Sequence, residues 1–210
     1  MIIKEELHGR ELTLDTGNYY FSPAGIDKGT SFMLSKVTVT EDDKALDLGC
    51  GYGVVGIWLK KCGCGVVVMC DISEDGVNLS KNNLKLNGIE GVKVLKSDGL
   101  KDVPDSDFTF ILSNPPYHTD FSVAKSFIED GFRKLAVGGR MIMVTKRLDW
   151  YKNKLTTVFG GVKVFEQDGY YVFISEKRSD KVVKKKKEKN NLSKKLQRKQ
   201  QRSGQNKRKI

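Results

Sequence analysis

The chain has 210 residues, including 37 Lys or Arg and 26 Asp or Glu, and a formal net charge of +11. This length is sufficient for one domain with a full hydrophobic core. No run of about 18 apolar residues occurs, and residues 1–6 combine a short apolar run with acids, so we expect neither a membrane-spanning helix nor a signal peptide.

The basic excess is confined to the C-terminal segment. Residues 177–210 hold 16 Lys or Arg against two acids, a net charge of +14, which leaves –3 for residues 1–176. A segment with so many like charges and almost no aromatic residues cannot bury a core, so we expect it to be disordered or partly helical when free. A solubilising tail is one interpretation. The favoured one is an arm that binds RNA phosphates without reading sequence. Membrane-surface binding is a further possibility in principle, but no lipidation motif accompanies the charges.

The four cysteines and two histidines do not have the spacing of metal ligands. The cysteines form no pair of C-x-x-C sets. We therefore expect reduced thiols, a cytoplasmic protein and no metal site. The cysteines are Cys50, Cys62, Cys64 and Cys70.

The predicted elements begin with a small β element within residues 1–36. Strands are expected at 12–14 and 19–21, joined by a turn at 16–18, and a short helix follows at 30–36. Strand and helix patterns then alternate, which predicts a mostly parallel sheet covered by helices on both faces. The expected order is strand 44–48, helix 54–62, strand 65–71, helix 73–87, strands 92–97 and 107–113, helix 121–136, strand 140–146, helix 149–158 and strands 162–167 and 170–175.

Two local signals refine this α/β prediction. Asp168-Gly169 between the last two runs is a hairpin signal, so we expect an antiparallel pair at the C-terminal edge of a seven-stranded sheet. The segment 137–140 is rich in glycine and predicts the turn from a helix into the fifth strand.

A glycine loop follows the first strand of this sheet. Asp47 precedes glycines at positions 49, 51 and 53, and residues 51–56 form a literal G-x-G-x-x-G, a weak signal shared with nicotinamide and flavin binders. Glycines allow a tight turn and close approach of the backbone to a ligand at a helix N-terminus. A carboxylate at Asp47 suits a ligand with a free ammonium group and opposes a pyrophosphate.

Acids also close the second and third strands. Asp71 can accept hydrogen bonds from two ribose hydroxyls, although Asp71 or Ser73 could instead cap the following helix. Asp98, followed by Gly99, could accept from the amine of a ligand base. An Asx turn is the alternative for Asp98.

The segment Asn114-Pro115-Pro116-Tyr117 closes the fourth strand. Proline fixes φ and removes the N–H donor, so the segment presents carbonyl acceptors in a rigid frame. The Asn114 carbonyl and a backbone carbonyl of the proline pair can accept the two hydrogens of an exocyclic –NH2 group, and Tyr117 can stack on its ring. The alternatives are a Pro-Pro turn that ends a strand and a Tyr117 that supports the loop.

These polar residues and glycines share one location. Asp47, Gly49, Asp71, Asp98 and Asn114 all fall at predicted strand ends, where open α/β sheets bind their ligands. The sequence therefore predicts one composite site.

The motifs together resemble the class I S-adenosylmethionine-dependent methyltransferases. The resemblance rests on three motifs, which are D-x-G-x-G-x-G at residues 47–53, the acid Asp71 and N-P-P-Y at residues 114–117. Residues 21–30, Phe-Ser-Pro-Ala-Gly-Ile-Asp-Lys-Gly-Thr, are similar to a stretch of the small-subunit ribosomal RNA guanine-N2 methyltransferases of the methyltransferase small domain family. The resemblance covers roughly residues 1–176, and the single copy and basic extension here differ from the two-halved bacterial members.

The resemblance implies S-adenosylmethionine as cofactor, S-adenosylhomocysteine as product, no metal, and methyl transfer to N2 of a guanine in small-subunit rRNA. It implies rRNA or the small ribosomal subunit as partner, no membrane, and a monomer or weak dimer. The implied catalytic residues are Asn114, Pro115, Pro116 and Tyr117. The implied cofactor-binding residues are Asp27, Thr30, Asp47, Gly49, Cys50, Gly51, Gly53, Asp71, Ile72, Asp98, Gly99 and Asn114.

Other functions remain open at this point. A glutamine side-chain amide of a protein and adenine N6 of a nucleic acid also offer a planar –NH2 group. A non-catalytic RNA-binding factor with a vestigial pocket is disfavoured because Asp47, Asp71 and Asn114 are intact. A nicotinamide oxidoreductase is the weakest alternative, because Asp47 opposes a pyrophosphate and no second catalytic domain follows.

Overall fold

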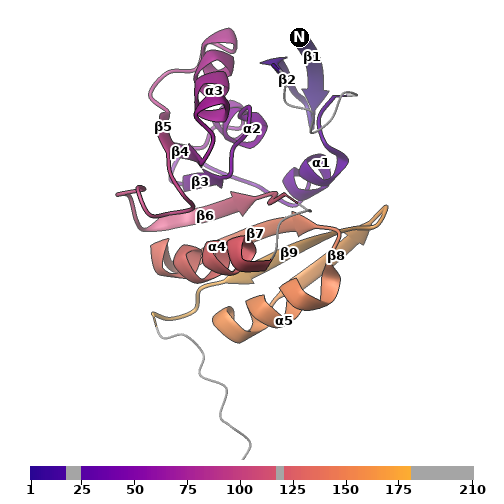
Figure 1. Ribbon diagram of the computed structural model, residues 1–210, viewed down its shortest axis with the longest axis vertical. Coiled ribbons are helices and arrows are strands. Elements are labelled where there is room, and N and C mark those ends of the chain that lie inside the picture. The colour runs from indigo at the N-terminus through magenta and orange to yellow at the C-terminus, as the bar shows by residue number, and fades with distance from the viewer. Residues whose placement is uncertain (18–24, 117–120, 181–210) are drawn as a thin grey trace, which may run out of the picture.

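The computed structural model describes residues 1–17, 25–116 and 121–180. These residues form a two-stranded sheet and a seven-stranded sheet (Figure 1). In the large sheet the strand order is β5-β4-β3-β6-β7-β9-β8. Its strands are β3 (Lys44–Leu48), β4 (Val66–Asp71), β5 (Lys93–Lys96), β6 (Phe108–Ser113), β7 (Leu135–Thr145), β8 (Lys163–Gln167) and β9 (Tyr170–Glu176).

The sheet confirms the predicted α/β architecture. Strands β3 to β7 run parallel, and β9 and β8 are antiparallel at one edge. The chain places β4 and β5 on one side of β3, and β6 and β7 on the other. The order therefore reverses between β3 and β6, and such a switch point opens a crevice at the carboxyl ends of the strands.

Helices cover both faces of the large sheet (Figure 1). Two hydrophobic clusters lie one on each face, because successive strand residues point to opposite sides. Ala45 joins the cluster beneath α1, α2 and α3, whereas Leu46 joins the cluster beneath α4 and α5. Within the described ranges, no helix combines the length and apolar character needed to cross a bilayer. The helices are α1 (Lys28–Leu34), α2 (Val54–Lys61), α3 (Glu74–Leu86), α4 (Phe121–Lys134) and α5 (Leu148–Phe159).

The small N-terminal β element has a different composition from the predicted one. Strand β1 (Ile2–Leu7) pairs antiparallel with β2 (Arg10–Asp15) across a turn at His8 and Gly9. The strand expected at 12–14 is confirmed within β2, and β1 is a strand that was not expected. The strand expected at 19–21 lies outside the described residues. The turn sequence is His8-Gly9, so it carries none of the Asn-Gly or Asp-Gly signals that mark a hairpin. His8 adopts a positive φ of 48°, which is uncommon for a non-glycine residue.

Two asparagine side chains of the α3 region hold the N-terminal hairpin in place. The Asn87 amide accepts from the backbone N–H of Thr13 (3.0 Å) and donates to its carbonyl (2.6 Å). Asn83 makes the same reciprocal pair with Asp15, at 2.7 and 2.9 Å. The carboxamides thereby satisfy the backbone groups of β2 that a third strand would otherwise pair.

Strand β7 begins five residues earlier than the predicted strand 140–146. Gly138 and Gly139 lie inside it, where the register with β6 shifts between Phe108 and Phe110. A Cβ at Gly139 would lie 2.6 Å from the Phe108 carbonyl oxygen, so the close pairing of the two strands requires glycine there. The predicted turn is therefore an irregular first part of the strand.

The packed chain continues past the predicted boundary at residue 176. The backbone of Lys177 bonds to Gly138 and Gly139, and its side chain is buried and donates to the Leu135 carbonyl (2.7 Å). Lys177 is therefore packed against the start of β7. Most of the predicted basic tail, residues 181–210, lies outside the described residues.

Candidate active site

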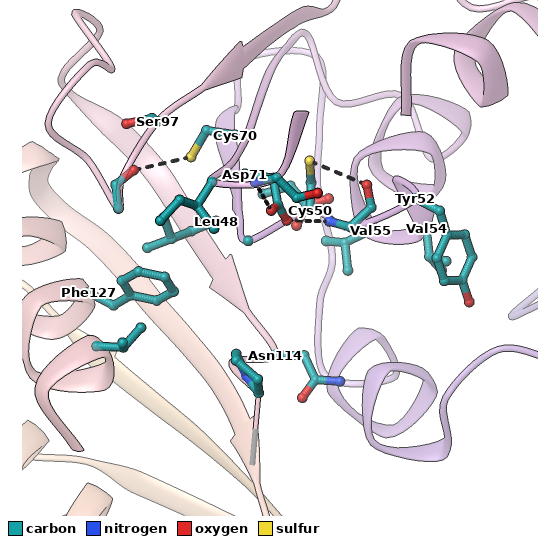
Figure 2. Close-up of a pocket in the computed structure, with 18 of the residues that line it drawn as sticks. Leu48, Cys50, Tyr52, Val54, Val55, Cys70, Asp71, Ser97, Asn114 and Phe127 are labelled. Atoms are coloured by element: carbon teal, nitrogen blue, oxygen red, sulfur yellow. Dashed lines mark hydrogen bonds between the residues drawn. The ribbon is translucent and has the colours of Figure 1, made fainter. Parts of the chain in front are cut away.

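A pocket of about 460 Å³ lies at the carboxyl ends of β3, β4 and β6 (Figure 2). It is therefore located at the switch point of the sheet. Asn114 lies at one end of the view, apart from Asp71 and Ser97, and Phe127 of α4 forms another wall. The lining residues are Asp27, Thr30, Asp47, Leu48, Gly49, Cys50, Gly51, Tyr52, Val54, Val55, Cys70, Asp71, Ile72, Ser73, Ser97, Asp98, Gly99, Asn114, Pro116, Val123 and Phe127.

The glycine loop needs glycine for its backbone and for its packing. Gly53 begins α2 with φ of 94° and does not line the pocket. A Cβ there would lie 3.0 Å from both Met69 Cε and Ser80 Oγ. The prediction that Gly53 binds cofactor thus has no support in the lining, and its role is to let α2 and α3 approach closely.

Helix α3 fixes the loop from behind. The buried Ser80 hydroxyl donates to the Gly51 carbonyl (2.8 Å), and the buried Asn83 amide donates to the Tyr52 carbonyl (2.8 Å). Both carbonyls are therefore paired with α3, which determines how the loop backbone faces the pocket.

Asp47 lines the pocket but is only 2 % exposed. Its carboxylate accepts from the backbone N–H of Gly56 in the first turn of α2 (2.9 Å). Burial raises the pKa of Asp47 to about 7, with repulsion from Asp71 adding to the rise and the Gly56 hydrogen bond opposing it. Asp47 thus joins the end of β3 to the start of α2, and a cation in the pocket would favour its ionised form.

Asp71 presents its carboxylate to the pocket from the end of β4. One oxygen accepts from the Gly51 N–H (2.8 Å) and the other from the Ser73 N–H (2.9 Å). Ser73, and not Asp71, caps α3 by accepting from Gly76. Each carboxylate oxygen keeps a further acceptor position, so Asp71 is held in place to bind a pair of hydroxyls.

Asp98 and Gly99 line the pocket beyond β5, beside Ser97. The Asp98 side chain is solvent-exposed and forms an ion pair with Lys101. Ser97 is buried and accepts from the backbone N–H of Asp102 (3.1 Å). Phe127 faces this region, since a Cβ on Gly99 would lie 3.5 Å from its ring.

Asn114 is held by the start of α1. Its amide nitrogen donates to Asp27 Oδ1 and to Thr30 Oγ1, each at 2.9 Å. The same Asp27 oxygen accepts from the Thr30 N–H and caps α1. Asp27 and Thr30 therefore orient the amide of Asn114, in addition to lining the pocket.

The segment after Asn114 is only partly described. Pro116 is exposed and lines the pocket, whereas Pro115 is buried and is absent from the lining. Tyr117 lies outside the described residues, so its stacking role stays a prediction.

The two cysteines of the pocket are protonated thiols. Burial raises the pKa of Cys70 to about 12, and burial followed by repulsion from Asp47 raises the pKa of Cys50 well above its usual value. A thiol must ionise to act as a nucleophile, so neither cysteine is suited to covalent catalysis near neutral pH.

Several residues that line or support the pocket carry no signal in the sequence. Val123 and Phe127 line it from α4, and apolar residues at such positions of a helix usually pack on the core. Ser80 and Asn83 read as ordinary polar positions of a surface helix, but both are fully buried. These assignments depend on contacts between segments far apart in the chain.

The arrangement suits two adjacent ligands. The glycine loop, Asp71 and the apolar side chains of Val123 and Phe127 can hold an elongated ligand that bears a diol and a planar ring. The oriented amide of Asn114 lies at the other end of the pocket, where it can accept a hydrogen from an amine.

Comparisons with known proteins agree with this description. The chain is 34 % identical over 166 residues to the ribosomal RNA small subunit methyltransferase C of Cronobacter sakazakii, covering 77 % of this chain and 48 % of that protein. The enzyme of the same name from Shewanella amazonensis is 36 % identical over 164 residues, which cover 75 % and 47 %. The chain thus spans about half the length of these curated relatives.

Solved structures share the fold. The 16S rRNA N2 G1207 methyltransferase RsmC of T. thermophilus, in complex with AdoMet and guanosine, superposes with a TM-score of 0.76 at 24 % identity, covering 85 % of this chain and 50 % of that one. The ribosomal protein L11 methylase of Lactobacillus delbrueckii subsp. bulgaricus gives 0.64 at 22 % identity, with coverage of 74 % and 82 %. The family model described as the methyltransferase small domain matches residues 11–175, and the chain therefore belongs to that family.

Proposed function

We propose that this protein transfers a methyl group from S-adenosylmethionine to an exocyclic amine, N2 of a guanine in small-subunit ribosomal RNA. One observation carries the proposal: Asp27 and Thr30 take both hydrogens of the Asn114 amide. The amide oxygen is thereby the atom that can accept a hydrogen from a substrate amine. The similarity to rRNA small subunit methyltransferases supports the choice of this substrate class.

The pocket suits S-adenosylmethionine by size and by chemistry. A volume of about 460 Å³ lies in the range of small-molecule sites. Asp71 offers two carboxylate oxygens to the ribose hydroxyls, and Asp47 offers a buried carboxyl near the loop that the ammonium group would approach. When bound, the cofactor supplies a methyl group made electrophilic by the attached sulfonium.

The residues of the protein would act mainly by positioning the target amine. The Asn114 oxygen and, as we infer, a backbone carbonyl of the Pro115-Pro116 pair accept one amine hydrogen each. The nitrogen lone pair, which is delocalised into the guanine ring, is then directed out of the ring plane. Acceptors aimed at the amine also stabilise the positive charge that develops on it. After transfer the amine loses a proton, which we assign to water.

The target base must leave any stack to reach this site. A base inside a duplex is inaccessible, so the guanine is flipped out or already unpaired. We assign Tyr117 to stack on it, an interaction worth roughly 1–3 kcal/mol in single-stranded nucleic-acid binding. The basic residues from 181 onward, with 14 Lys or Arg, are proposed to bind rRNA phosphates without reading sequence. We further propose that the protein acts in the cytoplasm and is a monomer or weak dimer.

Mass spectrometry of nucleosides tests the proposal. Ribosomal RNA and small subunits would be incubated with the protein and a cofactor whose methyl group carries deuterium, then digested to nucleosides. We expect labelled N2-methylguanosine, and an Asp71→Ala variant should give less label because it loses the ribose acceptor. Label in adenosine, or in a glutamine of the protein fraction, would show that the methyl acceptor is adenine N6 or a glutamine amide and not guanine N2. Tight cofactor binding with no labelled product would reject the enzymatic function.

A further inference from the structure

Aromatic and cationic side chains gather beside the end of the sheet that carries Asn114. Strand β7 neighbours β6, with Ser113 paired to Met143, and ends at Thr145. The next two residues, Lys146 and Arg147, are both exposed. They therefore follow the carboxyl end of β7, and the pocket is lined from the carboxyl ends of the strands of this sheet.

These cations lie over aromatic rings. The Arg147 guanidinium is 4.9 Å from the centre of the Phe121 ring, which stacks on Trp150 at 4.4 Å with an interplanar angle of 17°. Lys146 Nζ lies 4.7 Å from the centre of the Tyr170 ring. The three rings are half-buried. We refer to Phe121, Lys146, Arg147, Trp150 and Tyr170 as the cation–aromatic shelf.

The shelf is joined to the pocket on two sides. The Tyr170 hydroxyl donates to Asp27 Oδ2 (3.4 Å), and the other oxygen of this carboxylate holds the Asn114 amide. Phe121 begins α4, whose residues Val123 and Phe127 line the pocket. The shelf thus borders the Asn114 end of the pocket, and Asp71 lies beyond it at the cofactor end.

We propose that the cation–aromatic shelf binds the unpaired nucleotides that flank the target base. Lys146 and Arg147 would contact their phosphates, and Trp150, at the end of the stack formed with Phe121 and Arg147, would offer a ring face to one of their bases. This combination of backbone charge and stacking suits single-stranded nucleic acid, because every base has a ring face and a duplex hides it. The proposal rests on the proposed function, and it concerns the grip on RNA rather than the chemistry.

Charge substitutions in the full chain give the sharpest test. The probe is a fluorescently labelled, single-stranded RNA of nine nucleotides with one central guanine, and binding is followed by anisotropy across a salt series. The variant Lys146→Gln/Arg147→Gln leaves the α5 cap unaffected, since Arg147 makes no side-chain capping bond. The matched control is Lys81→Gln/Lys85→Gln, two exposed lysines of α3.

We expect the shelf variant to bind the RNA about 10-fold more weakly at low salt than wild type. The slope of log affinity against log salt concentration should be shallower by about 1.4, because the variant loses two phosphate contacts and each one on a single strand contributes about 0.7. The control should match wild type in both. A Trp150→Leu variant should also bind about 10-fold more weakly, with an unchanged salt slope. S-adenosylmethionine affinity reports whether each variant keeps an intact pocket.

Equal RNA binding by the shelf variant and its control would overturn the proposal. An equal loss on a duplex of the same sequence would also overturn it, because the shelf would then bind phosphates of any nucleic acid. The proposed function fails in a different way: wild-type protein would bind cofactor yet place no label on the same oligonucleotide or on rRNA. The two failures are therefore distinguishable.

Discussion

The Asn114 amide nitrogen lies 2.9 Å from a carboxylate oxygen of Asp27, although 87 positions separate the two residues in the chain. Asp27 also caps α1, so the helix start and the end of β6 share one carboxylate. A carboxylate only accepts hydrogen bonds, and this fixes which end of the carboxamide points toward it. The orientation of the proposed catalytic amide is thus determined by a helix cap.

Replacing Asn114 by Ala should lower kcat by roughly 10²–10³-fold, the usual loss when one oriented hydrogen-bonding group is removed from an active site. Cofactor affinity should change little, because Asp71 and the glycine loop are unaffected. Single-turnover methylation and calorimetry measure the two quantities. The matched control is Asn82→Ala, an exposed asparagine of α3. A variant that keeps the wild-type rate would remove Asn114 from the mechanism.

The isosteric change Asp27→Asn should separate orientation from folding. Asparagine caps helices as well as aspartate, so the free energy of unfolding should change little. The charge that fixes the Asn114 amide is lost, and we expect kcat to fall about 10-fold, because a hydrogen bond to a charged group is worth roughly 1.5–3 kcal/mol. Asp75→Asn, at an exposed position in the first turn of α3, is the control. Loss of stability without loss of kcat would show that Asp27 serves only as a cap.

Asp47→Asn should stabilise the protein at alkaline pH. The pKa of Asp47 rises from 3.8 to about 7 on folding, so its ionisation favours the unfolded state increasingly as pH rises through that interval. Above pH 7 the cost is on the order of 4 kcal/mol, at about 1.4 kcal/mol per pKa unit. Asparagine removes it and can still accept from Gly56. Urea unfolding should show the largest gain at pH 8, shrinking toward pH 4.

The same substitution should weaken S-adenosylmethionine binding. In wild type we expect affinity to rise as pH increases toward 7, because cationic cofactor favours the ionised carboxylate. The variant should lose this rise. If wild-type affinity is flat between pH 5.5 and 7.5, Asp47 does not interact with the cofactor charge, and its role is confined to the start of α2.

Asn87→Ala should loosen the N-terminal hairpin. The change leaves the N–H and the carbonyl of Thr13 without their side-chain partner, a loss of about 1–3 kcal/mol in the free energy of unfolding. Urea unfolding measures the loss, and hydrogen exchange should show faster exchange of the Thr13 amide. Asn82→Ala again serves as control. Similar stability for both variants would mean that the hairpin is held chiefly by its apolar face.

Truncation after Asp180 should weaken binding to rRNA and flatten its salt dependence by about 0.7–0.9 for each phosphate that the shortened protein no longer binds. Stability should not change. Truncation after residue 176 should also destabilise the fold, because it removes the buried Lys177 and its bonds to β7. Filter binding across a salt series, with urea unfolding alongside, compares the two. Unchanged RNA binding by the protein that ends at Asp180 would reject the phosphate-binding arm.

Local patterns in the sequence were sufficient for most of the large sheet. Residues 44–48 form a strand as predicted, because a short apolar run bounded by polar residues and glycines has few other ways to bury its side chains. The positions of Asp47, Asp71 and Asn114 follow from strand ends, since parallel strands bring their carboxyl ends together. The match between predicted and observed pocket residues at these positions has this origin.

Long-range packing accounts for what the sequence did not predict. Asn83 and Asn87 look like solvent-facing residues of α3 until the hairpin docks on them. The His8 turn depends on a positive φ that the sequence does not signal. Asp27 was assigned to the site by resemblance alone, and only the fold shows that it holds Asn114. For Asn83, Asn87 and Asp27, the partner that fixes the role of the side chain lies far away in the chain.

Strand β7 has one further consequence. Its carboxyl end carries Thr145 next to the proposed RNA shelf, whereas its amino end pairs with Lys177, from which the basic segment continues. Lys177 pairs with Gly138 and Gly139, so at about 3.3 Å per residue the strand separates these two points by roughly 20 Å. A free nucleoside or a very short oligonucleotide is too small to touch both. The protein would thus distinguish large RNA from small by molecular length, without reading a single base.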